Sequence, residues 1–190
     1  MGEYNFNFHG NVDNFAENCA MTQNQIDLFK ESCFGRFLSL PTITRSSKLI
    51  SNLMLRTGYY EGQPQSADKL LIELGGTPRE FTKQHYADIM GLKLAEDYNF
   101  KEKEYTDVIE KGLFDETFQK GALASRGNIS AFIEPSKEWG DVKRTRFLLL
   151  NFLYNVLLSG QPANPLPTSS YIKMVDDLDA FNSFPWGNVA

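Results

Sequence analysis

Hydrophobic residues recur along the chain with two spacings, and each spacing predicts a type of element. From Thr22 the apolar positions follow the 3-4-4-3 spacing that is typical of one face of an α-helix. These positions are Ile26, Phe29, Cys33, Phe37 and Leu40. Thr22 can form a capping box with Gln25, and Pro41 ends the run. The pattern therefore predicts a helix from residue 22 to residue 40.

The following segments predict a short helix, a hairpin and another helix. Residues 46–56 should form the short helix, which buries Leu49, Ile50, Leu53 and Met54. Residues 69–74 and 77–82 flank Gly75-Gly76, and two glycines can adopt the positive φ angles that a two-residue turn requires. Thr82 can then cap a helix that runs to Gly91.

The strongest helical pattern covers residues 142–159, which are apolar on nearly every side and should form the central element. A last helix, residues 171–182, should bury Tyr171, Val175, Leu178 and Phe181. The predicted fold is α+β, a mainly α-helical single domain over residues 22–190 with a small β-hairpin. The core should include Phe37, Leu53, Phe147, Leu150, Leu157, Leu178 and Trp186.

Residues 1–21 form a separate N-terminal arm in this interpretation. Tyr4, Phe6 and Phe8 alternate with Asn5 and Asn7, a period that suits an edge strand or an adhesive extended arm. A frayed terminus that docks only in part is an equal alternative.

Charge is unevenly distributed along the 190 residues, whose formal net charge is −5. Residues 96–116 hold eight acidic and three basic residues, so the remainder is balanced. The interval 32–60 has no acidic residue and carries Arg36, Arg45, Lys48 and Arg56. Four such cations could bind phosphates or an acidic segment of a partner. The alternative is that each pairs with acids elsewhere in the chain.

The residue types that catalysis or metal binding needs are scarce. The chain contains two cysteines, Cys19 and Cys33, and two histidines, His9 and His85, in no spacing typical of a catalytic set or a four-ligand metal site. Cys33 falls on the apolar stripe of the first helix, which favours a buried structural thiol. No enzyme activity, cofactor or metal is therefore expected.

A polar line interrupts the central helix at Asn151 and Asn155, with Arg144 near its start. Buried amides need partners, so this line should bind loop backbone and fix chain crossings; alternatively it lines a peptide groove. These interruptions also make the apolar segment far shorter than the roughly 20 residues that span a bilayer. With no basic and apolar leader at the N-terminus, the protein is expected inside the cell, in the nucleus or cytoplasm, and away from membranes.

The C-terminal segment Met174-Val-Asp-Asp-Leu-Asp-Ala-Phe-Asn-Ser-Phe-Pro-Trp-Gly187 joins an acidic amphipathic pattern to Phe-Pro-Trp-Gly. It resembles the closing motif of the plant "domain of unknown function 1985" family. Residues 31–40, 46–56 and 74–92 also fall where that family would place them. The resemblance implies a transposon-derived plant protein, in which such a domain often precedes a ubiquitin-like-protein-specific cysteine protease domain. It implies no activity for residues 1–190.

Together these observations favour a non-catalytic protein-interaction module of a plant transposon-derived protein, one that a host could retain for a regulatory or defence role. Its partner would be an unidentified protein. The alternative is a nucleic-acid-binding module that uses the basic surface of residues 32–60.

Overall fold

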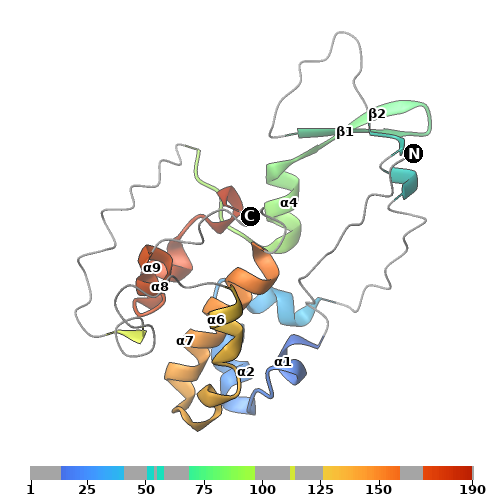
Figure 1. Cartoon of the computed structure of the whole chain (residues 1–190). Coiled ribbons are helices and arrows are strands. Elements are labelled where there is room, and N and C mark those ends of the chain that lie inside the picture. The colour runs from blue at the N-terminus through green and yellow to red at the C-terminus, as the bar shows by residue number, and fades with distance from the viewer. Residues whose placement is uncertain are drawn as a thin grey trace.

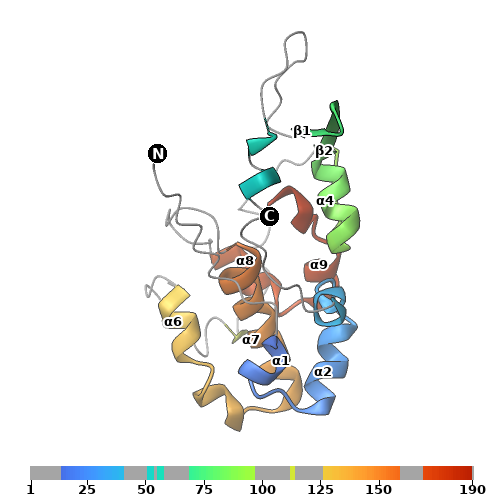
Figure 2. The same cartoon turned by 90° about the vertical axis from the view of Figure 1, so that its right-hand side faces the viewer.

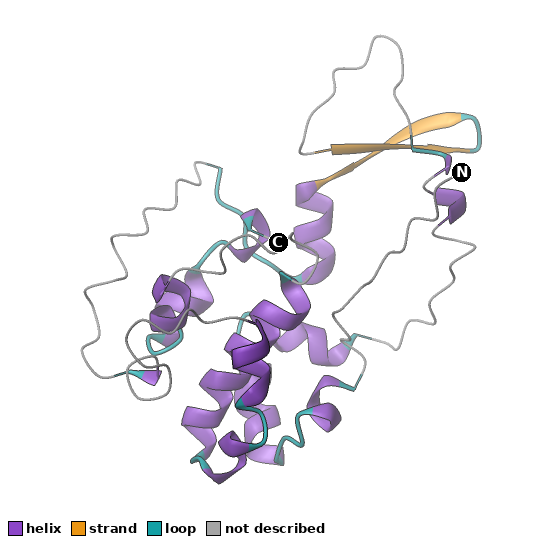
Figure 3. Cartoon of the chain, in the orientation of Figure 1, coloured by secondary structure: helices purple, strands orange, loops and turns teal. Residues whose placement is uncertain are grey.

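The structure is a computed structural model that describes residues 14–40, 51–53, 55–57, 69–96, 112–113, 126–158 and 169–189. Its helices and strands follow in chain order, with η marking 3₁₀- or π-helices. They are α1 (Phe15–Asn18), α2 (Gln23–Lys30), η1 (Gly35–Ser39), β1 (Lys69–Leu74), β2 (Thr77–Thr82), α4 (Lys83–Met90), α6 (Arg126–Ala131), η3 (Pro135–Glu138), α7 (Asp141–Phe152), η4 (Leu153–Leu157), α8 (Ser169–Met174), α9 (Leu178–Ser183) and η5 (Trp186–Asn188). Residues 51–53 and 55 are also helical. The predicted class, mainly helical α+β with one hairpin, is confirmed (Figures 1 and 3).

Helix α7 and its π-helical continuation η4 form the centre of the core, as predicted. Every residue from 147 to 154 is buried, because this segment is apolar on nearly every side and other elements cover each side. Phe152 contacts the rings of Phe15, Phe29, Phe34 and Phe37 at centroid distances of 4.9–5.7 Å. Helices α1 and α2 and the short η1 are thereby joined to α7.

The first helix begins as predicted but ends earlier. Thr22 and Gln25 form the expected capping box. Helix α2 ends at Lys30, so the prediction of one helix to residue 40 is wrong. A Cβ at Gly35 would lie 2.0 Å from the Lys30 carbonyl oxygen, and the Cys33 amide donates to Asn182 Oδ1 at 2.9 Å. A tight turn and a long-range hydrogen bond therefore replace the helical ladder before η1 begins.

The hairpin and the helix after it agree with the prediction. Strands β1 and β2 pair antiparallel, with Leu74 opposite Thr77, and Gly75 and Gly76 have φ angles of 62° and 77°. Thr82 caps α4, and Gly91 ends it at a φ of 71°. In both views the hairpin stands at one end of the molecule and leads into α4 (Figures 1 and 2).

The last predicted helix is divided into α8 and α9, which corrects the prediction of one helix over residues 171–182. The reason is local: the Asp177 carboxylate accepts a hydrogen bond from the Ala180 amide at 3.1 Å and caps a new helix. Tyr171, Val175 and Phe181 are buried as predicted.

The predicted core residues differ in their burial. Phe37, Phe147, Leu150 and Trp186 lie in one buried cluster, and Leu157 and Leu178 are half-buried against it. Leu53 is half-buried outside this cluster, and residues 56 and 57, which follow it, bond to β1.

The core also includes residues from the predicted N-terminal arm. Phe15 and Cys19 are buried in the cluster around α7, so the core begins before residue 22. Residues 1–13, where the aromatic alternation falls, lie outside the described residues.

Candidate functional site

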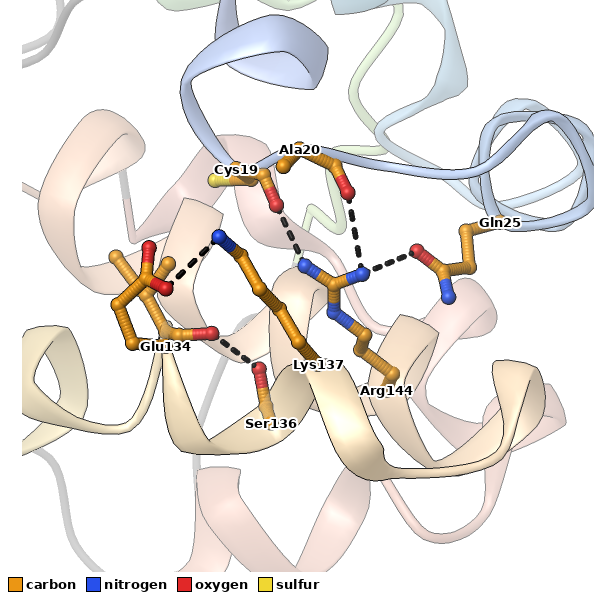
Figure 4. Close-up of polar contacts among 8 residues, drawn as sticks. Cys19, Ala20, Gln25, Glu134, Ser136, Lys137 and Arg144 are labelled. Atoms are coloured by element: carbon orange, nitrogen blue, oxygen red, sulfur yellow. Dashed lines mark hydrogen bonds and ion pairs between the residues drawn. The ribbon is translucent and has the colours of Figure 1, made fainter.

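The Arg144 side chain is buried and joins three segments of the chain. It is 2% exposed and donates hydrogen bonds to the Cys19 carbonyl at 2.6 Å, the Ala20 carbonyl at 3.1 Å and Gln25 Oε1 at 3.0 Å (Figure 4). The same close-up shows the nearby ion pair of Lys137 with Glu134. Arg144 thus holds α7 against the chain between α1 and α2.

The two asparagines of the polar line also bind groups of this chain. Asn155 Nδ2 donates to Asn151 Oδ1 at 2.7 Å and to Ser130 Oγ at 3.2 Å. Asn151 is 3% exposed, and its Nδ2 lies 3.8 Å from Cys19 Sγ. The contacts with Ser130 and Cys19 cross between segments of the chain, whereas the bond between the two asparagines lies within the continuous helix of α7 and η4. The groove predicted from Arg144, Asn151 and Asn155 stays a prediction.

Both cysteines are free thiols whose acidity is lowered by burial. Burial raises the pKa of Cys19 to about 11 and that of Cys33 to about 12. The reactive form of a cysteine is the thiolate, and at pH 7 a pKa of about 11 leaves about 10⁻⁴ of Cys19 in that form. Both side chains therefore act as small apolar groups of the core.

Asp141 links the first turn of α7 to the first turn of α2. Its carboxylate accepts hydrogen bonds from Asn24 Nδ2 at 3.2 Å, Gln25 Nε2 at 2.7 Å and Thr22 Oγ1 at 3.3 Å. These bonds, with that from Asn24 the largest contribution, lower the pKa of Asp141. The contact adds a second connection between the helices that Arg144 joins.

The structure describes two of the four predicted surface cations. Arg36 is exposed, and its Nη1 donates a hydrogen bond to the Asp88 carbonyl at 3.1 Å. Its side chain thereby lies over Gly91 and supplies a donor to one of the last carbonyls of α4. Arg56 is exposed next to β1, and its carbonyl accepts from the Glu73 amide at 3.0 Å.

The backbones of these two cations lie at opposite ends of α4, a helix about 12 Å long. Glu73 is a further four strand positions from the start of α4, because it pairs with Pro78. Arg36 and Arg56 are therefore not neighbours on one surface. Arg45 and Lys48 lie outside the described residues.

Exposed apolar side chains are concentrated on the hairpin and its flanks. Among the described residues, six large apolar side chains are exposed, and five of them fall between residues 55 and 89. They are Leu55 (81%), Leu70 (44%), Leu74 (46%), Phe81 (36%) and Ile89 (54%), and the sixth is Val142 (53%). The sequence pattern predicted the hairpin but not this exposed apolar surface.

The strand register places three of these side chains on one face of the hairpin. Residues opposite each other share a face, so Leu70, Leu74 and Phe81 lie together, with Ile72 and Arg79 between them. The other face carries the ion pair of Lys69 with Glu80 at 2.9 Å, together with Glu73. Alternate residues of the two strands differ in polarity, so a period of two in residues 69–82 is the sequence signal for this difference between the faces.

The apolar face continues onto α4. The Phe81 and His85 rings contact each other at a centroid distance of 6.1 Å, and Ile89 follows one turn later. We call Leu70, Leu74, Phe81, His85 and Ile89 the hairpin stripe. All five side chains are exposed.

Two further results concern metal ions and membranes. Within the described ranges, no three His, Cys, Asp or Glu side chains form a group that could hold a metal ion. None of the helices in those ranges is long and apolar enough to cross a membrane.

The Phe-Pro-Trp-Gly motif lies against α4 and the chain that follows it. Trp186 is 1% exposed, and its Nε1 donates to the Phe181 carbonyl at 2.8 Å. Gly187 donates from its amide to the Lys93 carbonyl at 2.9 Å, so the motif ties α9 to the chain after α4. Its residues hold the helix that carries part of the hairpin stripe.

Comparison with known proteins identifies a family. No curated protein and no solved structure matches the chain. The family model described as Domain of unknown function (DUF1985) matches residues 61–190, which include the hairpin, α4 and the C-terminal motif. Residues 31–40 and 46–56, which contributed to the resemblance, precede the matched span. Because the match covers more than half of the sequence, the chain belongs to the DUF1985 family.

Proposed function

We propose that this chain is a non-catalytic protein-interaction module that binds its partner through the hairpin stripe. The observation that carries the proposal is that, among the described residues, five of the six exposed large apolar side chains lie between residues 55 and 89, and four of these five belong to the stripe. Single exposed apolar residues are ordinary, whereas a contiguous patch marks an interaction surface. The plant, transposon-derived origin, a host regulatory or defence role, and a location in the nucleus or cytoplasm remain part of this proposal.

The size of the stripe is suited to a reversible contact. Its four apolar side chains expose roughly 300 Å² by their exposed fractions, within the range of functional patches on monomers. At about 25 cal/mol/Å² the burial of this area would contribute about 7 kcal/mol before the costs of association. Additional polar contacts would be needed for tight binding.

The chemistry of the described residues supports a non-catalytic role. The thiols of Cys19 and Cys33 are protonated at neutral pH by burial. His85 Nδ1 accepts the Thr82 amide at 3.1 Å, so this imidazole has a capping role in α4.

A binding experiment with matched variants tests the proposal. Wild-type chain, the double variant Leu70→Asp/Leu74→Asp and the control Val142→Asp would each be used to capture proteins from plant extract. We expect one or more proteins to bind wild type and Val142→Asp equally and to be lost with the double variant, because only the latter places charge in the stripe. Equal capture by all three would contradict the proposal.

Nuclease treatment of the extract separates the two function classes. We expect capture to survive the nuclease treatment, because the contact is apolar. In addition, Arg36 and Arg56, the two described members of the predicted basic surface, lie apart. Loss of every captured protein after nuclease treatment, together with micromolar binding to duplex DNA that falls steeply with salt, would favour the nucleic-acid alternative.

A further inference from the structure

We infer that the partner segment is an amphipathic helix with an acidic residue, which lies across the hairpin stripe and places its carboxylate on Arg79. This inference rests on the proposed function and specifies the partner's chemistry. Three features of the hairpin lead to it: the outer edge of β2, the apolar face and the charge on that face.

The outer edge of β2 is unsuited to an added strand. Residues 74 and 77 flank a two-residue turn and form a hydrogen-bonded pair, so the backbone groups of Pro78, Glu80 and Thr82 point away from β1. Proline has no N–H to donate, and the Thr82 amide already donates to His85 Nδ1. Glu80 is left as the single outward donor of β2. A partner strand would therefore find no continuous ladder.

The outer edge of β1 is engaged by this chain. The Glu73 amide donates to the Arg56 carbonyl at 3.0 Å, and Thr57 bridges Ile72. A partner on the hairpin must therefore satisfy its own backbone hydrogen bonds. A helix does so internally, whereas an extended segment does not.

The face of the hairpin has the dimensions that a short helix covers. Leu70 and Leu74 are four strand positions apart, about 13 Å. The stripe continues onto α4 with His85 and, one helical turn later, Ile89. Apolar residues at positions i, i+3, i+4 and i+7 of a partner helix can therefore contact the stripe. Packing a helix on one face of a sheet is also the usual way to cover it.

The charge on this face determines the polar chemistry of the partner. Arg79 lies opposite Ile72, is exposed, and has no ion pair in the part of the chain that the structure describes. The two carboxylates nearest in the register, Glu73 and Glu80, belong to the other face, where Glu80 pairs with Lys69. A guanidinium at the edge of an apolar surface binds a carboxylate in two parallel hydrogen bonds.

A second copy of the chain is a poor occupant for the same surface. A two-fold pairing would bring the Arg79 side chains of both copies to one interface, with no carboxylate on that face to neutralise them.

Three synthetic peptides of equal length test the inference with the full chain. The first is a helix-favouring peptide with leucines at i, i+3, i+4 and i+7 and flanking glutamates. The second carries lysines in place of the glutamates, and the third rearranges the first to a period-two pattern. Affinity would be measured by fluorescence anisotropy of the labelled peptides.

We expect the acidic helical peptide to bind at least about tenfold more tightly than either other peptide, a difference of about 1.4 kcal/mol. Arg79→Glu should reverse the preference between the glutamate and lysine peptides. Leu74→Asp should abolish binding, and Val142→Asp should leave it unchanged. Tighter binding of the period-two peptide, or no response to Arg79→Glu, would overturn the inference.

The results also separate this inference from the proposed function. If no peptide binds but capture from extract still depends on Leu70 and Leu74, the helical and acidic partner is wrong and the interaction module stands. If the chain forms a dimer in analytical ultracentrifugation that Leu74→Asp dissociates, the stripe binds a second copy and the inference is overturned. If capture does not depend on the stripe, both fail.

Discussion

At the scale of single residues, Arg144 shows how a buried cation can join distant parts of one chain. Three acceptors contact its guanidinium: the carbonyls of Cys19 and Ala20, which follow α1, and Oε1 of Gln25, which also belongs to the capping box of α2. The network therefore couples the first turn of α7 to the first turn of α2 and to the chain before it. The charge of such a residue is visible in the sequence, whereas its partners within the chain are not.

We expect Arg144→Met to lower the free energy of unfolding by about 2–6 kcal/mol. The change leaves the Cys19 and Ala20 carbonyls without the donor that Arg144 supplies, at about 1–3 kcal/mol for each unsatisfied buried group. Urea unfolding followed by circular dichroism measures the loss. The matched control is Lys137→Met, which removes a surface ion pair worth at most about 1 kcal/mol. Equal losses for the two variants would show that the Arg144 network contributes little.

At the scale of elements, α7 and the hairpin have opposite characters. From Phe147 on, every residue of helix α7 is buried, so its stability comes from packing. The hairpin has one exposed apolar face and depends on its turn and on α4 for its conformation.

Leu150→Ala should lower the free energy of unfolding by about 2–5 kcal/mol, because Leu150 is fully buried in α7 and its truncation leaves a cavity. Val142→Ala on the same helix is the control. Val142 is 53% exposed, so its loss should stay within about 0.5 kcal/mol. Chemical denaturation of both variants provides the comparison, and a loss below about 0.5 kcal/mol for Leu150→Ala would place α7 outside the core.

Gly76→Ala should destabilise the hairpin by about 1–2 kcal/mol, because Gly76 has a φ of 77° and an L-residue is strained in that region. Gly75→Asn is the control, since asparagine is favoured at the first position of this turn. Hydrogen exchange of the Leu70 and Phe81 amides measures local opening of the hairpin. Similar exchange in both variants would mean that the turn does not determine hairpin stability.

At the scale of the whole molecule, the C-terminal motif joins parts of the chain that are distant in sequence. Trp186 packs among the core aromatics, and Gly187 lies against the segment that follows α4. The Asn188 side chain accepts from the Ala95 amide at 2.9 Å and donates to the Ala95 carbonyl at 3.1 Å. The motif thereby holds α4, and with it the hairpin stripe, on the core.

Gly187→Ala should therefore lower stability by about 1–3 kcal/mol and increase hydrogen exchange in α4. A Cβ at this position would lie 2.9 Å from the Lys93 carbonyl oxygen and 3.1 Å from Leu94 Cδ2. Gly140→Ala is the control, because a Cβ there meets no atom within 4 Å, and it should cost less than about 1 kcal/mol. Unchanged exchange in α4 of the Gly187 variant would contradict the proposed connection.

The sequence by itself determined the features that depend on neighbours in the chain. Period and capping residues located α2, α4 and α7, and Gly75-Gly76 located the hairpin turn, because propensity and local hydrogen bonds act over a few residues. The composition and the C-terminal motif also identified the fold class and the family.

Tertiary structure alone decided where helices ended and which surface stayed exposed. The end of α2 at Lys30 depends on a hydrogen bond from Cys33 to Asn182, 149 positions away. The partners of Arg144 and the separation of Arg36 from Arg56 likewise depend on how distant segments pack. The side chains of the hairpin stripe are exposed because no described element covers that face of β1 and β2. The local pattern of apolar residues does not indicate which apolar face the rest of the chain will cover.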